Sequence, residues 1–220
     1  MHTTYFGPIS WYRLLIENEK LKMENSQFST FNFQLNSDEF YVKQTTRNHC
    51  CIATANGVQK LTVPVTLPTK GIETGASKKL GCPIRDVRIS DHGNWRHQHW
   101  EALKSAYGMS PFFEYYADDI APFFEKRWDF LYDYNMEITT KVLELLGPFP
   151  TAILRTSNTA ASNSLPSEAF REGRGGSLAG SLPYYQTFQL RHGFIPDLSI
   201  LDLLFNMGPE SILILKGAKN

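Results

Sequence analysis

The sequence has few cysteines, and their number and spacing exclude two common scaffolds. Three cysteines stand among 220 residues, at positions 50, 51 and 82. Three thiols cannot pair completely, and Cys50 and Cys51, as neighbours in a strand, would point to opposite faces. No Cys-x-x-Cys spacing of a zinc site is present. We therefore expect buried free thiols and no disulfide framework.

The sequence also has no net charge and no long apolar run. Lys and Arg number 22, and so do Asp and Glu. Such a surface does not attract nucleic acid or anionic lipid. No stretch approaches the roughly 18 apolar residues of a membrane span, and residues 1–12 lack the basic start of a secretory signal. We expect a soluble, cytoplasmic protein with no membrane span and no nucleic-acid partner.

Common catalytic and cofactor motifs are absent as well. The sequence has no Gly-x-Ser-x-Gly, no phosphate loop ending in Gly-Lys-Ser, no His-Glu-x-x-His and no Gly-x-Gly-x-x-Gly after a strand. His92, His97 and His99 are a weak zinc set, because positions 97 and 99 of one helix diverge. We therefore predict no metal site, and the sequence assigns no cofactor.

The length favours a single domain over residues 1–220, since domains run to roughly 100–200 residues. From about residue 156 to 181 the sequence is rich in Ser, Ala, Gly and Arg and has no periodicity. We expect a mobile loop there, with a lid over a substrate and a packed segment as alternatives. No internal repeat is visible.

The segments on either side predict a mixture of strands and helices. Asn56-Gly57 between two β-prone runs is a strong signal for a hairpin. We expect further strands at residues 3–9, 21–24, 86–90 and 211–215, and a strand or an extended segment at 184–188. Helices are expected from residue 11, from 95, after 110, over 121–134, from 135 to 146 and from 200. The predicted fold class is α/β, with one mixed sheet and packed helices, or α+β if the sheet is mainly antiparallel.

Several motifs together resemble the WbqC-like family of bacterial proteins. They are Tyr5-Phe6-Gly7-Pro8, Lys43 to Asn48, Asn56-Gly57 leading to Leu61-Thr62-Val63-Pro64-Val65, Asn94 to Trp100, Ser110 to Phe113, and Pro196-Asp197-Leu198-Ser199-Ile200 to Asn206-Met207-Gly208-Pro209. The resemblance implies a role in synthesis of O-antigen or other surface polysaccharides. The usual family opening, Gln-Pro-x-Tyr-x-Pro, also resembles that of Rossmann-like nucleotidylyl transferases. Here only Tyr5, Gly7 and Pro8 match it.

The segment from Asn94 to Trp100 concentrates polar side chains at the predicted start of a helix. Free N–H groups there favour an anion, and Arg96 could bind it. We expect Asn94 to cap this helix and to bind substrate, and His99 to act as the general base. The alternative for His99 is a structural histidine that donates an N–H to a backbone carbonyl beside the core.

A second polar cluster, Arg47-Asn48-His49, precedes the hairpin. Arg47 suits a phosphate or carboxylate, and Asn48 a hydroxyl. The alternative is a structural turn, with Arg47 paired to a nearby carboxylate. The resemblance adds Lys43 and Gln44 to the substrate-binding candidates.

Asp202 and Asn206, four residues apart on a predicted helix, could hold sugar hydroxyls. Alternatively, Asp202 completes the cap of that helix and Asn206 ends it.

Together these clusters predict that Arg47 and Arg96 face one cleft and hold an anionic small molecule. With the family resemblance, they favour an enzyme, for example a transferase, acting on a sugar phosphate or nucleotide sugar. A non-catalytic binding or scaffold protein of the same pathway is the alternative. The oligomeric state is left open by the sequence.

Overall fold

The computed structural model describes residues 1–23, 31–68, 82–147, 151–156 and 182–217. The helices in this part of the chain are α1 (Ile9–Met23), α2 (Trp95–Tyr107), α3 (Phe113–Ile120), α4 (Pro122–Glu125), α5 (Leu131–Leu145), α6 (Gln189–His192), α7 (Ile200–Met207) and α8 (Ser211–Leu215). Two short 3-10 helices are η1 (Ile84–Asp86) and η3 (Gly208–Glu210). The predicted loop at about 156–181 lies almost entirely outside the described residues.

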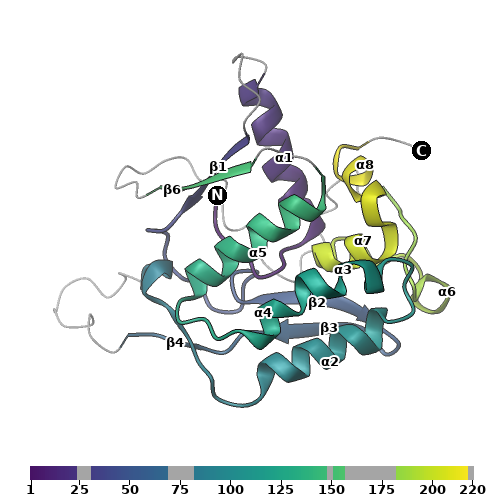
Figure 1. The fold of residues 1–220 in the computed structure, drawn as a ribbon, viewed down its shortest axis with the longest axis horizontal. Helices are drawn as coiled ribbons and strands as arrows, with labels where there is room; N and C mark the ends of the chain where they lie inside the picture. The colour runs from purple at the N-terminus through teal and green to yellow at the C-terminus, as the bar shows by residue number, and fades with distance from the viewer. Residues whose placement is uncertain (24–30, 69–81, 148–150, 157–181, 218–220) are drawn as a thin grey trace.

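The strands form three separate two-stranded sheets (Figure 1). They are β1 (Phe31–Asn36) parallel to β6 (Thr151–Thr156), β2 (His49–Thr54) antiparallel to β3 (Gly57–Thr62), and β4 (Val65–Thr66) antiparallel to β5 (Arg88–Ile89). The mixture of helices and strands confirms the coarse fold class. The single mixed sheet that we predicted is wrong for the described residues, and no Rossmann-like sheet is present among them.

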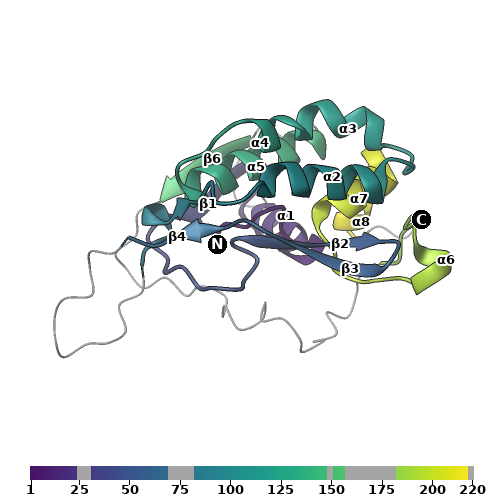
Figure 2. The same cartoon turned by 90° about the horizontal axis from the view of Figure 1, so that it is seen from below.

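The β2–β3 hairpin forms where Asn56-Gly57 predicts it, with Thr54 paired to Gly57. Gly57 has a φ of 108°, which favours glycine, and this turn geometry suits the twist of a hairpin. In Figure 2, α2 to α5 lie on one side of the hairpin. Helices α2 and α7 both contact β2, so this hairpin positions the start of α2 relative to the core.

The N-terminal segment runs through the core without forming the predicted strand. Tyr5 and Phe6 are fully buried. The N–H of Tyr5 donates to the carbonyl of Thr46 at 2.9 Å, and the N–H of Ile9 donates to that of Leu198 at 3.0 Å. These bonds to two distant segments satisfy the backbone in place of a strand partner.

Two predicted strands are helical in the structure. Helix α1 continues through Met23, because neither Gly nor Pro interrupts the chain from Ser10 onward. Residues 211–215 form α8, which packs Ile214 and Leu215 into the core against α1 and α7. A short apolar run has no periodicity that separates strand from helix. Of the two alternatives for 184–188, the strand does not form: residues 184–186 have no regular secondary structure, and a turn at 187–188 leads into α6.

The predicted helix over 121–134 is split in the structure. The backbone between α4 and α5 is extended, since the N–H of Ile89 donates to the carbonyl of Asp129 and that of Leu131 donates to Val87, both at 2.9 Å. Asn135 is fully buried inside α5 and does not cap it. Its Nδ2 donates to the carbonyl of Arg47 at 2.8 Å. Asn135 therefore bonds to a segment far away in the sequence and not to the start of its own helix.

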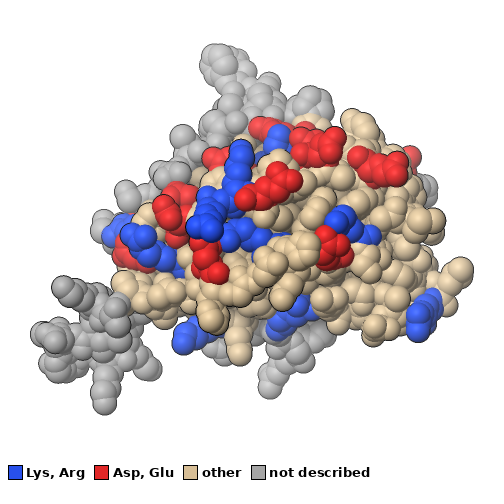
Figure 3. Space-filling view, turned by 60° about the horizontal axis from the view of Figure 1, so that its bottom comes forward, with Lys and Arg blue, Asp and Glu red and all other residues tan. Residues whose placement is uncertain are grey.

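Basic and acidic side chains lie close to one another on the face shown in Figure 3, as the balanced composition predicts. No helix in the described ranges is long and apolar enough to cross a membrane.

Candidate functional site

A pocket of about 300 Å³ opens at the first turn of α2. Its lining residues are Gly93, Asn94, Arg96, His97, Trp100, Phe124, Glu125 and Arg127. The start of α2 therefore forms one wall, and α4 with the residues that follow it forms the other. The Trp100 and Phe124 rings stack with their centroids 5.6 Å apart. The pocket thus combines two arginines, a histidine, aromatic rings and an amide, which suit an anionic ligand with an apolar face, with one carboxylate, that of Glu125.

Local geometry presents the first turn of α2 to this pocket. Gly93, with a φ of 74°, turns the chain, and the indole N–H of Trp95 donates to the carbonyl of Ser90 at 3.0 Å. Asn94 occupies the N-cap position but makes no capping hydrogen bond with its side chain. The expected cap is therefore wrong, and Asn94 lines the pocket instead. The first N–H groups of the helix keep their partial positive charge toward a ligand.

The guanidinium group of Arg96 has hydrogen-bond donors that are not satisfied by the described residues. Its side chain is only 13% exposed, and its carbon Cζ lies 4.6 Å from the centre of the Trp95 ring. Nη1 donates to Asp91 Oδ1 at 2.6 Å. Nε and Nη2 are buried and have no hydrogen-bond partner among the described residues. Buried donors without partners are rare and costly, so these two call for an acceptor that binds there.

Asp91 is shared between the two arginines of the pocket. Its Oδ2 lies 3.7 Å from Nη1 of Arg127, whose side chain is 84% exposed. The hydrogen bond from Arg96 and the charges of both arginines hold the pKa of Asp91 below its ordinary value. A carboxylate therefore lies at the point where the two cations come together.

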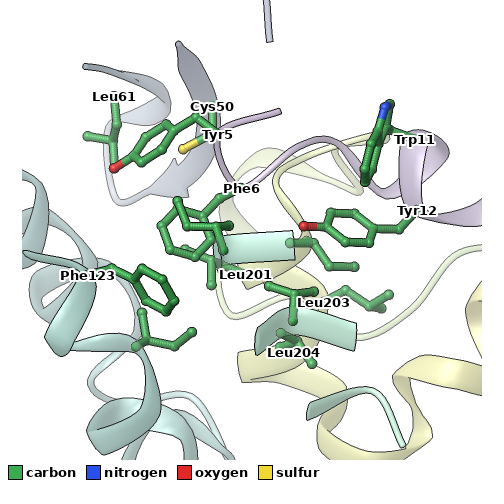
Figure 4. Close-up of a cluster of buried hydrophobic side chains, with 14 of the residues drawn as sticks. Tyr5, Phe6, Trp11, Tyr12, Cys50, Leu61, Phe123, Leu201, Leu203 and Leu204 are labelled. Atoms are coloured by element: carbon green, nitrogen blue, oxygen red, sulfur yellow. The ribbon is translucent and has the colours of Figure 1, made fainter. Parts of the chain in front are cut away.

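The two histidines of the motif have different environments. His97 lines the pocket, and its side chain is 62% exposed. His99 is buried, and its Nδ1 lies 2.8 Å from the hydroxyl of Tyr5, which is packed beside Cys50 and Leu61 (Figure 4). Of the two, His97 is the one that the pocket exposes to a ligand.

The contacts of His99 match the alternative prediction for it, a structural histidine that bonds to the backbone beside the core. Burial lowers its pKa to about 4, and a hydrogen bond to the backbone of Thr62 opposes this shift. Because that bond favours the protonated ring, we assign the donating N–H to Nε2, and Nδ1 then accepts from Tyr5. His99 thus links α2 to the N-terminal segment and to β3 as a neutral imidazole. It is not among the residues that line the pocket.

The structure places Arg47 in a buried ion pair. Its Nη2 lies 2.9 Å from Oε2 of Glu39, whose Oε1 accepts from the N–H of Thr3 at 3.2 Å. Burial raises the pKa of Glu39, and Arg47 opposes this rise. Asn48 donates to the carbonyl of Val63 at 3.1 Å. These contacts match the alternative prediction for this cluster, a structural turn in which Arg47 is paired with a carboxylate. Nε of Arg47 and Oδ1 of Asn48 are buried and have no partner within the described ranges.

Of the two predicted cationic clusters, around Arg47 and around Arg96, only the second lines the described pocket. Arg96 lines it and Arg47 does not, and each arginine is paired with a different acid. Lys43 and Gln44 are exposed in the turn before Arg47, where Gln44 has a φ of 57°.

Asp202 and Asn206 lie inside α7 and form a buried polar network. Asp202 is fully buried and accepts from the hydroxyls of Tyr107 at 2.8 Å and Tyr184 at 2.6 Å. Burial raises the pKa of Asp202, and these hydrogen bonds oppose the rise. Oδ1 of Asn206 accepts from the Thr187 hydroxyl at 2.8 Å. Asp202 does not complete the cap of α7, because the N–H of Ser199 donates to the carbonyl of Cys51 at 2.8 Å, and α7 continues past Asn206 to Met207.

Sequence reasoning did not find several residues that the structure brings together. Glu125, at the end of α4, and Arg127, just after it, line the pocket, and Asp91 pairs with two of its arginines from a loop; no periodicity or motif marks these positions. Gln186, in the other network, donates to Asp202 at 3.2 Å. Of the pocket residues that we did not predict as ligands, Trp100 lies within the Asn94 to Trp100 motif, but its helical spacing is typical of a core residue.

The described part of the chain is thus a protein of helices and small sheets with one cation-lined pocket at a helix start. The model of the WbqC-like protein family matches residues 30–172, and the chain belongs to this family. The matched range contains the pocket and ends before α7. An uncharacterized protein of Mycobacterium tuberculosis, Rv1507c, is 29% identical in an alignment of 208 residues that covers 81% of this chain and 85% of the relative. No solved structure matches the chain.

Proposed function

We propose that this protein is a cytoplasmic enzyme of bacterial surface-polysaccharide synthesis, a transferase that binds a phosphorylated or nucleotide-linked sugar in the pocket at the start of α2. The observation that carries the proposal is the pair of buried, unpartnered donors of Arg96 in the wall of that pocket. A phosphate oxygen would satisfy them, with the free N–H groups of the helix start nearby. The association of the family with polysaccharide synthesis supports the choice of sugar ligand.

The other lining residues have roles that follow from their chemistry. Trp100 and Phe124 stack on each other and supply an apolar part of the wall, against which the carbon skeleton of a sugar can lie. Asn94 can donate and accept with hydroxyls. His97 is the histidine on the pocket wall, and this position favours it over His99 as the general base. The proposal does not depend on Arg47, Asn48, Lys43, Gln44, Asp202 or Asn206 as substrate ligands.

Calorimetric titration with a panel of nucleotide sugars and sugar 1-phosphates tests the binding role. We expect at least one of them to bind the wild-type protein. Arg96→Met should weaken that binding about 10- to 150-fold, the range for loss of charged hydrogen bonds. Arg88→Met is the matched control, because Arg88 also lies over an aromatic ring, 4.7 Å from the centre of Phe130, but does not line the pocket. Equal affinity of Arg96→Met and wild type would contradict the proposal.

Turnover of the bound sugar separates an enzyme from a binding protein. We expect His97→Gln to retain binding and to lose turnover, with His99→Gln as the comparison. If the ligand binds but no acceptor supports turnover, the chain is the binding or scaffold protein of the same pathway. That alternative is favoured by one observation, the absence of any serine, threonine or cysteine among the residues that line the described pocket.

A further inference from the structure

Asp91 occupies a position in the structure that an anionic ligand would need. One carboxylate oxygen lies 2.6 Å from Nη1 of Arg96, and the other lies 3.7 Å from Nη1 of Arg127. Both arginines line the pocket. A carboxylate that spans two guanidinium groups has the charge and oxygen spacing with which a phosphoryl group binds arginines.

The hold on Asp91 is weak enough to be exchanged for a ligand. Its side chain is 49% exposed, and one of its two partners, Arg127, is 84% exposed, so water and salt screen that pair. The other partner, Arg96, is 13% exposed, and its 2.6 Å hydrogen bond is the contact that a ligand has to replace. Its neighbour Ser90 is anchored through the carbonyl of Pro64 and the indole of Trp95, so rotation of the Asp91 side chain alone would free the arginines.

We infer that the carboxylate of Asp91 competes with the ligand for Arg96 and Arg127. It pairs with both arginines when no ligand is bound, and the phosphate groups of the ligand displace it. This inference rests on the proposed function and makes it narrower. A ligand that must replace a carboxylate on two arginines needs more than one negative charge. Pyrophosphate esters, such as nucleoside diphosphate sugars, meet this condition better than neutral sugars or monocarboxylates do.

Titration with inorganic pyrophosphate at fixed salt tests the inference. We expect Asp91→Asn to bind pyrophosphate about two- to fivefold more tightly than wild type, the gain from no longer having to break a partly exposed ion pair. Asp118→Asn is the matched control, because it removes the same charge from an exposed position of α3 outside the pocket. Its affinity should equal that of wild type.

A second measurement uses the unmodified protein and does not depend on the folding of a variant. The carboxyl carbon resonance of Asp91, followed by NMR during a pH titration, should report a higher pKa with saturating pyrophosphate than without it. The sign follows because the hydrogen bond from Arg96 that lowers this pKa is lost and a second negative charge arrives.

The outcomes separate the inference from the proposed function. If wild type binds pyrophosphate and Asp91→Asn binds no more tightly, or gains no more than Asp118→Asn does, Asp91 does not compete. An unchanged pKa of Asp91 in the saturated protein would overturn the inference as well. If neither wild type nor Asp91→Asn binds pyrophosphate, the pocket is not a phosphate site, and the proposed function fails together with the inference.

Discussion

At the scale of single residues, neighbours in the sequence have unrelated roles. Arg96 and His97 face the pocket, while His99 lies in the core against Tyr5. On a helix, residues two apart point to different sides, so a motif of adjacent polar residues is divided between core and surface. The motif therefore places Arg96 and His97 in a pocket wall, while His99, the histidine that we predicted as the base, is buried.

Replacing His99 by glutamine should reduce the loss of stability in acid. In the folded protein the pKa of His99 is about 4, against an ordinary value of 6.5. Between these values the unfolded chain binds a proton that the folded protein does not, so the free energy of unfolding falls as the pH falls through this window. The shift of the His99 pKa corresponds to a loss of about 3 kcal/mol in the free energy of unfolding across this window. Urea unfolding near the two ends of the window measures it.

The matched control for this prediction is His97→Gln, since His97 lies on the same helix and is 62% exposed. That variant should keep the pH dependence of the wild type. His2, whose pKa burial lowers to about 3, acts in the same direction in all three proteins and cancels in the comparison. Identical pH dependence in His99→Gln and wild type would show that His99 is not held neutral.

At the scale of elements, helix starts are stabilised by residues far away in the sequence. The backbone N–H of Ser10, at the start of α1, donates to Oδ1 of Asp197 at 2.8 Å, and its hydroxyl donates to Oδ2 at 2.9 Å. Asp197 has a φ of 56°, which aspartate and asparagine tolerate better than most residues. The motif around Asp197 therefore caps a helix that begins 188 positions earlier in the chain, at Ile9.

Asp197→Ala should lower the free energy of unfolding by about 1–2 kcal/mol, because the start of α1 loses its cap. Asp197→Asn keeps one acceptor for Ser10 and tolerates the same backbone angle, so its loss should be smaller. Chemical denaturation of both variants measures the two values. An alanine variant as stable as the asparagine variant would show that the contact with Ser10 contributes nothing.

At the scale of the whole molecule, one buried carboxylate joins parts of the chain that lie far apart. Asp202 of α7 accepts from Tyr107 of α2 and from Tyr184, and the hydroxyl of Tyr107 accepts in turn from the N–H of Ala53 in β2. A satisfied network of this kind fixes the relative positions of its members. The hairpin, two helices and the segment before α6 are thereby held together.

Tyr184→Phe should lower the free energy of unfolding by about 1–3 kcal/mol, because buried Asp202 loses a short hydrogen bond and keeps its desolvation cost. Tyr185→Phe is the control. Its ring is 55% exposed, so its effect should stay within about 0.5 kcal/mol. Denaturant unfolding measures both, and equal values for the two variants would remove the network from the interactions that stabilise the fold.

The sequence alone determined the features that depend on local chemistry. The Asn56-Gly57 hairpin and the starts of α2 after Asn94 and of α7 at Ile200 are confirmed, because turn geometry and helix periodicity involve residues a few positions apart. The family membership is also confirmed. Arg96 was named as a ligand for an anion, and the structure places it in a pocket wall.

Only the tertiary structure decided how the strands pair and which polar residues meet. The extended backbone at Asp129 and Phe130, the parallel pairing of β1 with β6 and the helix at 211–215 arise from partners far along the chain. Asp91 and Arg127 come together at the pocket for the same reason. Hydrogen bonds and ion pairs form between whatever groups packing brings within reach, and sequence spacing has no bearing on contacts of this length.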